Sequence, residues 1–202
     1  MENLIIYAFI YLLSSIPFGL ILSKTFAQIN IKNEGSNSIG ATNVLRVIKE
    51  KNPRLAKKLA IATVILDFSK AAIPLLILKW LNYDQSLLWS VGVLAVFGHC
   101  FSIYLSFEGG KGIATGAGAM IILLPLEVLI AFIVWFLIGK IFKISSLASL
   151  MALLTFISTS FIFHYDLEIN THAPIFIIAF IITYKHLPNI KRLLFKEECK
   201  VI

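Results

Sequence analysis

The sequence predicts an all-α polytopic membrane protein that forms a single membrane-embedded domain over residues 1–202. Hydrophobic residues make up 58% of the 202 residues and charged residues only 14%, a composition that one soluble core cannot accommodate. Several apolar runs approach the roughly twenty residues that a helix needs to cross a bilayer. The sequence lacks the alternating pattern of a membrane barrel, so helices are the expected spanning elements.

About seven transmembrane helices are expected, and three of them are short. The first contains Pro17 and lacks the basic start of a cleaved signal peptide, which favours a retained helix. The third and fourth flank a glycine-rich segment that is too polar for lipid, so we expect partial spans around a pocket shielded by protein. A five-span arrangement that merges the short pieces is the alternative. The expected ranges are 4–22, 59–78, 86–98, 113–124, 126–142, 146–163 and 174–184.

The positive charges predict the orientation of these helices, because Lys and Arg collect in short loops on the cytoplasmic side. Of the 18 Lys and Arg residues, all but Lys70 and Lys79 fall in the segments 23–58, 99–112, 139–145 and 185–202. The N-terminus is therefore expected outside and the C-terminus in the cytoplasm. The net charge of +7 follows from this topology and from attraction to anionic membrane lipid or substrate, and no nucleic acid is expected as a partner.

The first polar segment, Gly35 to Arg46, is expected to bind an anion. Gly35 and Gly40 let the backbone turn so that successive amides can point at one anion. Arg46 supplies a guanidinium fork that suits phosphate oxygens. The alternative is an ordinary loop in which Thr42 caps a short helix. Further hydrogen-bond donors in the segment are Ser36, Ser38, Thr42 and Asn43.

The second polar segment places Gly109, Gly110 and Lys111 just before a helix that is expected to start at about Gly112. A helix start offers unpaired amides and a positive dipole end, and Lys111 adds a full charge. The segment is not a Walker A loop, because Gly112 stands where that loop requires Ser or Thr, so nucleotide hydrolysis is disfavoured. The alternative role of the glycines is to let helices pack closely. The alternative for the lysine is that it only marks the cytoplasmic side of the membrane.

The third polar segment lies at the inner end of the last helix. His186, Asn189 and Arg192 recur every three residues and would share one side of a helix, although Pro188 opposes helical structure there. Asp67 and Lys70 lie within a predicted membrane helix, where a charged residue usually has a partner. We therefore expect them to form a structural ion pair rather than to contact substrate directly.

The three segments together, in this order, resemble the bacterial acyl-phosphate-dependent glycerol-3-phosphate acyltransferases, the PlsY family, over nearly the whole chain. The matching stretches are G-S-N-S-I-G-A-T-N at 35–43 with Arg46, then G-H at 98–99 with F-E-G-G-K-G-I-A-T at 107–115, then His186 with N-I-K-R-L at 189–193. The sequence departs from the family pattern at Ser38, Ser102, Glu108 and Leu187.

The resemblance implies transfer of a fatty acyl group from acyl phosphate to the 1-hydroxyl of sn-glycerol 3-phosphate. The products would be lysophosphatidate and phosphate, in the first step of phospholipid synthesis. The site would face the cytoplasm from the bacterial inner membrane, and a soluble enzyme that produces acyl phosphate would be a further partner. The donor is already activated, so no cofactor or metal is expected. The H-x-x-x-x-D pattern of acyltransferases that use acyl-CoA is missing, as is a G-x-S-x-G nucleophile elbow.

Residues that match the family motifs are the expected site. The catalytic group would be Ser36, Arg46, Lys111, His186 and Asn189. Further substrate contacts would come from Gly35, Ser38, Gly40, Thr42, Asn43, His99, Gly109, Gly110, Gly112, Thr115 and Arg192. His99 is expected more as a support for the glycine loop than as a catalyst.

Two cations carry most of the expected chemistry. Arg46 with Ser36, and Lys111 with the amides near the double glycine, would hold the two phosphates and stabilise the charge of the tetrahedral carbonyl. Asn43 and Asn189 would orient the glycerol hydroxyls. His186 would either accept the hydroxyl proton or only bind substrate, since the donor phosphate can also take that proton.

A transporter or channel for a small anion is the alternative function, because broken helices with positive ends aimed at one site are a transporter device. A binding scaffold for other enzymes of lipid synthesis is a third reading. Both alternatives would lack turnover of the two substrates.

Overall fold

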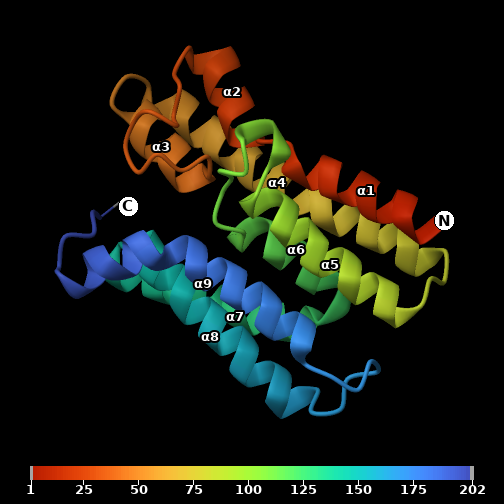
Figure 1. Ribbon diagram of the computed structural model, residues 1–202. Helices are drawn as coiled ribbons and strands as arrows, with labels where there is room; N and C mark the ends of the chain where they lie inside the picture. Colours follow the sequence, from red (N-terminus) through yellow and green to blue (C-terminus); the bar gives the residue numbers. More distant parts are fainter. Residues whose placement is uncertain (1, 201–202) are drawn as a thin grey trace.

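The helices of the computed structural model, which describes residues 2–200, lie in two groups (Figure 1). One group holds α1, α4, α5 and α6, with α2 and α3 beside one end, and the other holds α7, α8 and α9. The bounds are Glu2–Ser15 (α1), Phe18–Ala27 (α2), Ala41–Lys49 (α3), Pro53–Trp80 (α4), Gln85–Cys100 (α5), Ile113–Leu123 (α6), Pro125–Phe142 (α7), Ser145–Phe163 (α8) and Ala173–Leu194 (α9), with a 3₁₀ turn at Ile103–Leu105.

The prediction of an all-α polytopic membrane protein is confirmed. Within residues 2–200, six helical segments are long and apolar enough to cross a membrane, and α6 is a shorter apolar helix of 11 residues. The six spans exceed the five of the merged alternative. Together with the short helix α6 they agree with the expected total of about seven helices, some of them short. The six segments are Glu2–Ala27, Pro53–Trp80, Gln85–Leu105, Pro125–Phe142, Ser145–Phe163 and Ala173–Leu194.

The first span is not the continuous helix expected over 4–22, because it breaks after Ser15. Pro17 has no N–H to donate and its ring disfavours helical structure in the residue before it. The break leaves backbone carbonyls without helical partners, and side chains from other segments satisfy two of them. Ser102 Oγ donates to Ser15 O at 2.6 Å, and Lys70 Nζ donates to Ile16 O at 3.0 Å.

The last helix runs ten residues beyond its expected end at 184. Pro188 lies inside α9 without ending it. The helix therefore carries His186 and Asn189 on one buried face, as their spacing predicts, with Arg192 one turn further along. The expected sharing of one helix side is confirmed.

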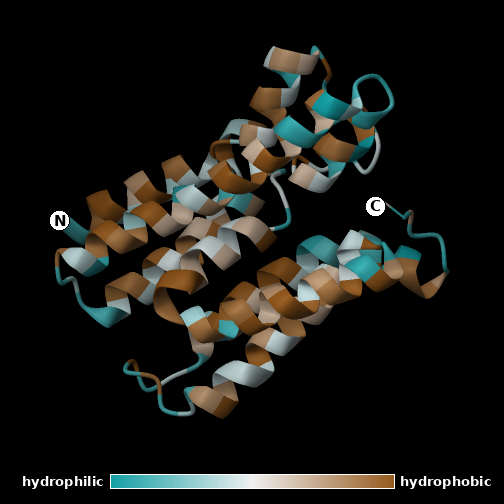
Figure 2. Ribbon diagram, turned by 180° about the vertical axis from the view of Figure 1, so that it is seen from behind, coloured by the Kyte–Doolittle hydropathy of each residue, from teal (hydrophilic) through white to brown (hydrophobic). Residues whose placement is uncertain are grey.

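The first polar segment is ordered by a small hydrophobic core of its own. Ile31, Ile39, Val44 and Ile48 are almost fully buried against the start of α4. Each such burial contributes about 1.5–3 kcal/mol, which offsets the entropy of fixing an otherwise polar loop. Hydrophilic residues gather at this end of the molecule and along the C-terminal segment (Figure 2).

Candidate active site

One cavity of about 460 Å³ joins all three polar segments. Its polar lining comes from helix ends: Thr42 lies in the first turn of α3, Lys111 precedes α6, and Ser146 lies in the first turn of α8. Its apolar lining comes from the interiors of helices, as with Phe132 and Phe156. The cavity therefore runs from polar helix ends into the membrane region. Further apolar lining residues are Val64, Phe68, Met120, Ile121, Val128, Leu129, Trp135, Leu153, Ile178 and Ile182.

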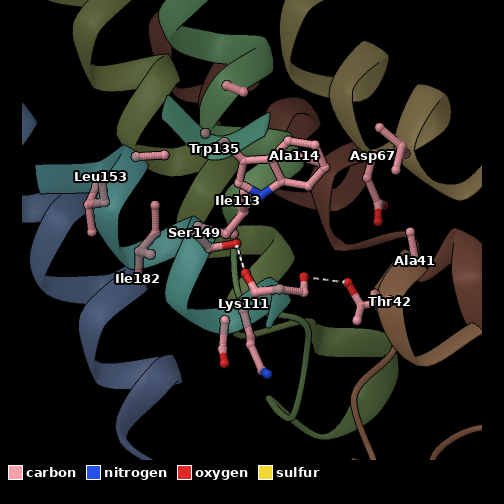
Figure 3. A pocket seen from close by; sticks show the side chains of 18 of the residues that line it. Ala41, Thr42, Asp67, Lys111, Ile113, Ala114, Trp135, Ser149, Leu153 and Ile182 are labelled. Atoms are coloured by element: carbon pink, nitrogen blue, oxygen red, sulfur yellow. Dashed lines mark hydrogen bonds between the residues drawn. The ribbon is translucent and has the colours of Figure 1, made fainter. Parts of the chain in front are cut away.

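The cavity brings together most of the predicted site residues. Those that line it are Ser36, Ser38, Gly40, Thr42, Asn43, Arg46, His99, Lys111, Gly112, His186 and Asn189. Those that lie outside its lining are Gly35, Gly109, Gly110, Thr115 and Arg192. Figure 3 shows Lys111 and Ser149 at the cavity, with Thr42 approaching from α3 and the ring of Trp135 beside them.

Arg46 is the cation that the first segment contributes. Its Nε is buried and has no hydrogen-bond partner within residues 2–200. A guanidinium is an obligatory donor, so an unmatched buried N–H beside a cavity is the arrangement expected for a residue that binds an anion. The predicted phosphate contact of Arg46 agrees with this geometry.

Asn43 holds the first polar segment in place through its side-chain amide. Its amide nitrogen lies within 3.1 Å of the carbonyls of Ile31, Glu34 and Ser38, and its Oδ1 accepts from Ser36 N at 2.9 Å. The donors of this side chain are therefore used in holding the loop, while its expected contact with a glycerol hydroxyl stays a prediction. A side chain at Gly35, whose φ is +62°, would collide with this amide.

Thr42 does not cap the short helix, as the alternative reading proposed. The residue before α3 is Gly40, and no side chain caps the helix there. The hydroxyl of Thr42 instead lies 3.0 Å from Ser145 Oγ, which connects α3 to the start of α8 across the cavity. The hydrogen bond is drawn in Figure 3.

The double glycine does not offer its own amides to a ligand, which corrects the second expectation. Gly109 N donates to Cys100 O and Gly110 N donates to His99 O, each at 3.0 Å. These bonds fold the segment back on the end of α5, and side chains at either glycine would overlap His99 or its carbonyl. The glycines are needed for close approach of the backbone.

The amides that remain available belong to the first turn of α6. The helix begins at Ile113 after Gly112, which takes a left-handed φ of +86°, so the predicted helix start is confirmed. Ile113 and Ala114 line the cavity, and their amides have no hydrogen-bond partner in the described part of the chain. A helix start of this kind carries partial positive charge.

Lys111 is the second cation at the cavity, and its surroundings disfavour its charge. Burial lowers its pKa to about 8, while Glu198 acts in the opposite direction and Arg192 and Arg46 lower it further. Three cations from three segments therefore act on one small region. An anionic substrate there would relieve their mutual repulsion.

His186 presents an acceptor nitrogen at the cavity. Its Nδ1 donates to Ile182 O at 2.8 Å, which leaves Nε2 as the acceptor of a neutral ring. The residue is 2% exposed. A hydroxyl that reaches Nε2 could donate a hydrogen bond or transfer its proton.

Glu198 is a site residue that the sequence did not reveal. Its Oε1 accepts from Asn189 Nδ2 at 2.7 Å and from Ser146 Oγ at 2.9 Å, and its Oε2 accepts from Arg192 Nε at 2.6 Å. Although partial burial opposes ionisation, these donors hold the pKa of Glu198 below its usual value. Arg192 is thus engaged by a carboxylate through its Nε, and its expected contact with substrate stays a prediction.

The departure from the family pattern at Glu108 does not place a negative charge in the cavity. The carboxylate points away and pairs with Lys32 at 3.3 Å, with 78% of its side chain exposed. Asn189, by contrast, keeps a buried Oδ1 that has no partner among residues 2–200. That oxygen remains available to a substrate hydroxyl.

Comparison with known proteins decides the family. A family model described as glycerol-3-phosphate acyltransferase matches residues 4–196. The chain belongs to this acyltransferase family. A glycerol-3-phosphate acyltransferase from Campylobacter jejuni subsp. doylei is 84% identical over 202 residues, with both chains fully covered. One from Aliarcobacter butzleri is 53% identical over 201 residues, covering 100% of this chain and 97% of the relative.

Two solved structures share the acyltransferase fold. One is PlsY (YgiH), an integral membrane glycerol 3-phosphate acyltransferase, in its glycerol 3-phosphate form. It is 32% identical, with a TM-score of 0.86 and coverage of 99% of this chain and 96% of that one. The lysophosphatidic acid form is 34% identical, with a TM-score of 0.83 and coverage of 99% and 95%. The resemblance found from the sequence motifs is confirmed.

Proposed function

We propose that this acyltransferase moves a fatty acyl group from acyl phosphate to the 1-hydroxyl of sn-glycerol 3-phosphate. The observation that carries the proposal is that Arg46 and Lys111 both lie at the polar end of a cavity whose other end is lined by apolar side chains. The two cations would bind phosphate groups, and the apolar part of the cavity would accommodate an acyl chain. Family membership favours this activity over anion transport or a scaffold, and residues 1–202 would act as one domain.

In the proposed reaction, the 1-hydroxyl oxygen attacks the acyl carbonyl carbon and the bond from that carbon to the phosphate oxygen breaks. The hydroxyl proton goes to the leaving phosphate, either directly or through His186 Nε2. Arg46, Lys111 and the first amides of α6 would hold the phosphates and stabilise the negative charge that develops on the carbonyl oxygen. Positioning of two activated substrates supplies a further part of the rate.

The donor is tested with the purified protein in mild detergent or lipid. The protein would receive glycerol 3-phosphate with either palmitoyl phosphate or palmitoyl-CoA, and lysophosphatidate and phosphate would be followed. Product with palmitoyl phosphate alone is the expected result. Product with palmitoyl-CoA alone would overturn the proposed donor. Uptake of glycerol 3-phosphate into sealed vesicles without product would favour transport.

The rate should fall as the pH rises through the pKa of Lys111. We expect kcat/KM for glycerol 3-phosphate to decline above about pH 8, because that pKa lies at about 8 and only the protonated amine attracts phosphate. Charged groups that face Lys111 are Glu198, Arg192 and Arg46. A pH series of initial rates measures the decline. A Lys111→Arg variant with residual activity should lack it, and a flat profile to pH 10 in the unmodified enzyme would contradict the assignment.

The proposed orientation places the site in the cytoplasm of a bacterium, with the C-terminus inside. Cys199 is exposed and Cys100 is buried, so one native thiol can report on the C-terminal end. A membrane-impermeant maleimide should label Cys199 only after the cells are made permeable. A Glu168→Cys variant in a Cys199→Ser background should be labelled in intact cells, and the reverse pattern would invert the topology.

A further inference from the structure

Lys70 is buried in the middle of α4, and its ammonium group connects three segments of the chain. Its Nζ lies 3.0 Å from Ile16 O at the break between α1 and α2, 2.8 Å from Asp67 Oδ1, and 2.9 Å from His99 Nδ1 near the end of α5. An ammonium has three N–H donors, and each has one acceptor here. The predicted pairing of Asp67 with Lys70 is confirmed by these contacts.

The contact with Lys70 fixes the state of the His99 ring. Because the ammonium donates to Nδ1, the ring is neutral with its hydrogen on Nε2. Asp67 Oδ1 is 3.7 Å from the same Nδ1, too far for a hydrogen bond. The His99 side chain is 5% exposed, so within residues 2–200 its orientation depends on the contact with Lys70 and on packing.

His99 in turn contacts the residue that precedes Lys111. Its ring lies against Gly110, where a side chain would overlap Nε2, and its carbonyl accepts from Gly110 N at 3.0 Å. The ring and the backbone of one residue therefore set the path of the chain into Lys111. A displacement of the ring would be passed on to the ammonium of Lys111 in the cavity.

We propose that Lys70, together with Asp67, is a positioning residue that holds the His99 ring against Gly110 and so fixes Lys111 in the cavity. This inference rests on the proposed function for its effect on turnover. An ion pair serving stability alone would be replaceable, because apolar residues of similar size often substitute for a buried pair without loss of stability. Such residues have no donor for His99 Nδ1, and that difference separates the two roles.

The test replaces both charges at once, with Asp67→Leu and Lys70→Met in one variant, so that no unpaired charge stays buried. We expect an unfolding temperature close to that of the unmodified enzyme and a fall in kcat/KM for glycerol 3-phosphate of about 10²-fold. The matched control is Lys79→Met on the same helix. Lys79 also donates to a backbone carbonyl, that of Ile122, but is exposed, so this variant should keep its rate.

A second readout follows Lys111 without turnover. Burial lowers the pKa of Lys111 to about 8, and a loosened segment would let water reach the amine. The pH dependence of its modification by an amine reagent, followed by mass spectrometry, should therefore shift to higher pH in the double variant. If Lys70 and Asp67 served stability alone, the double variant would remain folded and the pH profile of Lys111 modification would not shift.

A variant pair at His99 decides the matter if the double variant does not fold. His99→Asn keeps an acceptor for Lys70 at the position of Nδ1 and should retain activity within about 10-fold, while His99→Leu, which has a similar shape and no acceptor, should lose about 10²-fold. A folded double variant, or a folded His99→Leu variant, with unmodified kcat/KM and an unmodified Lys111 profile would overturn the inference. Absence of acyl transfer in the unmodified protein would reject the proposed function, and the Lys111 profile would still test the positioning.

Discussion

Replacement of Lys111 by Met should lower kcat/KM for glycerol 3-phosphate by on the order of 10²- to 10³-fold, the loss typical of removing one preorganised charge or donor from a reacting site. Methionine keeps the length and the apolar stem of the side chain and removes only the ammonium. The phosphates would then face Arg46 and the first amides of α6 without a second full charge. Steady-state rates with palmitoyl phosphate measure the effect.

The unfolding temperature of the Lys111→Met variant should change little, because the side chain belongs to neither buried hydrophobic cluster. Lys24→Met is the matched control, since Lys24 is an exposed lysine of α2 that does not line the cavity. Its rate should equal that of the unmodified enzyme. A Lys111→Met variant with unmodified kcat/KM would remove Lys111 from the site and leave Arg46 as the main phosphate ligand.

The sequence located the two cations and the histidine of the candidate site because charged and titratable residues are rare in this chain and each of the three stands in a motif. Arg46 and Lys111 follow glycine-rich stretches, and His186 lies where an apolar helix turns polar. All three line the same cavity. Residue type and local pattern were enough for them, because a cation beside a glycine-rich turn or a helix start is typical of an anion site.

The atoms that would bind substrate were harder to predict than the residues. The amides of Gly109 and Gly110, and the side chain of Asn43, were expected to face a ligand, yet nearby backbone groups use them. Which donors remain free depends on how a loop folds back on its neighbours. No local pattern in the sequence carries that information.

Glu198 and the serines of α8 were missed for a related reason. Ser146 lies at an ordinary helix start, and Glu198 lies in a charged tail that reads as a solvated flank. Only the folded chain brings them to Asn189 and Arg192. Two of the helix boundaries that differ from the expected ones, after Ser15 and beyond 184, show that a proline ends a helix in one tertiary setting and is accommodated in another.

Replacement of Gly110 by Ala should also cause a large loss, about 10²-fold in kcat/KM for glycerol 3-phosphate. The added methyl group would overlap the His99 ring, so either the ring or the backbone before Lys111 must move. Gly139→Ala is the matched control. There the new Cβ would lie 3.8 Å from Ala148 Cβ, which is an ordinary contact. Alanine in place of glycine within a helix should increase the free energy of unfolding by up to about 1 kcal/mol.

A double-mutant cycle separates this overlap from a general loss of flexibility. If the collision between the new methyl group and the ring causes the defect, Gly110→Ala should cost little in a His99→Ala background, because the ring is no longer there to be displaced. Equal costs in both backgrounds would place the defect in the backbone of residue 110. Since Gly110 has no positive φ, strain at that backbone is not expected, and strong coupling between the two positions is the predicted result.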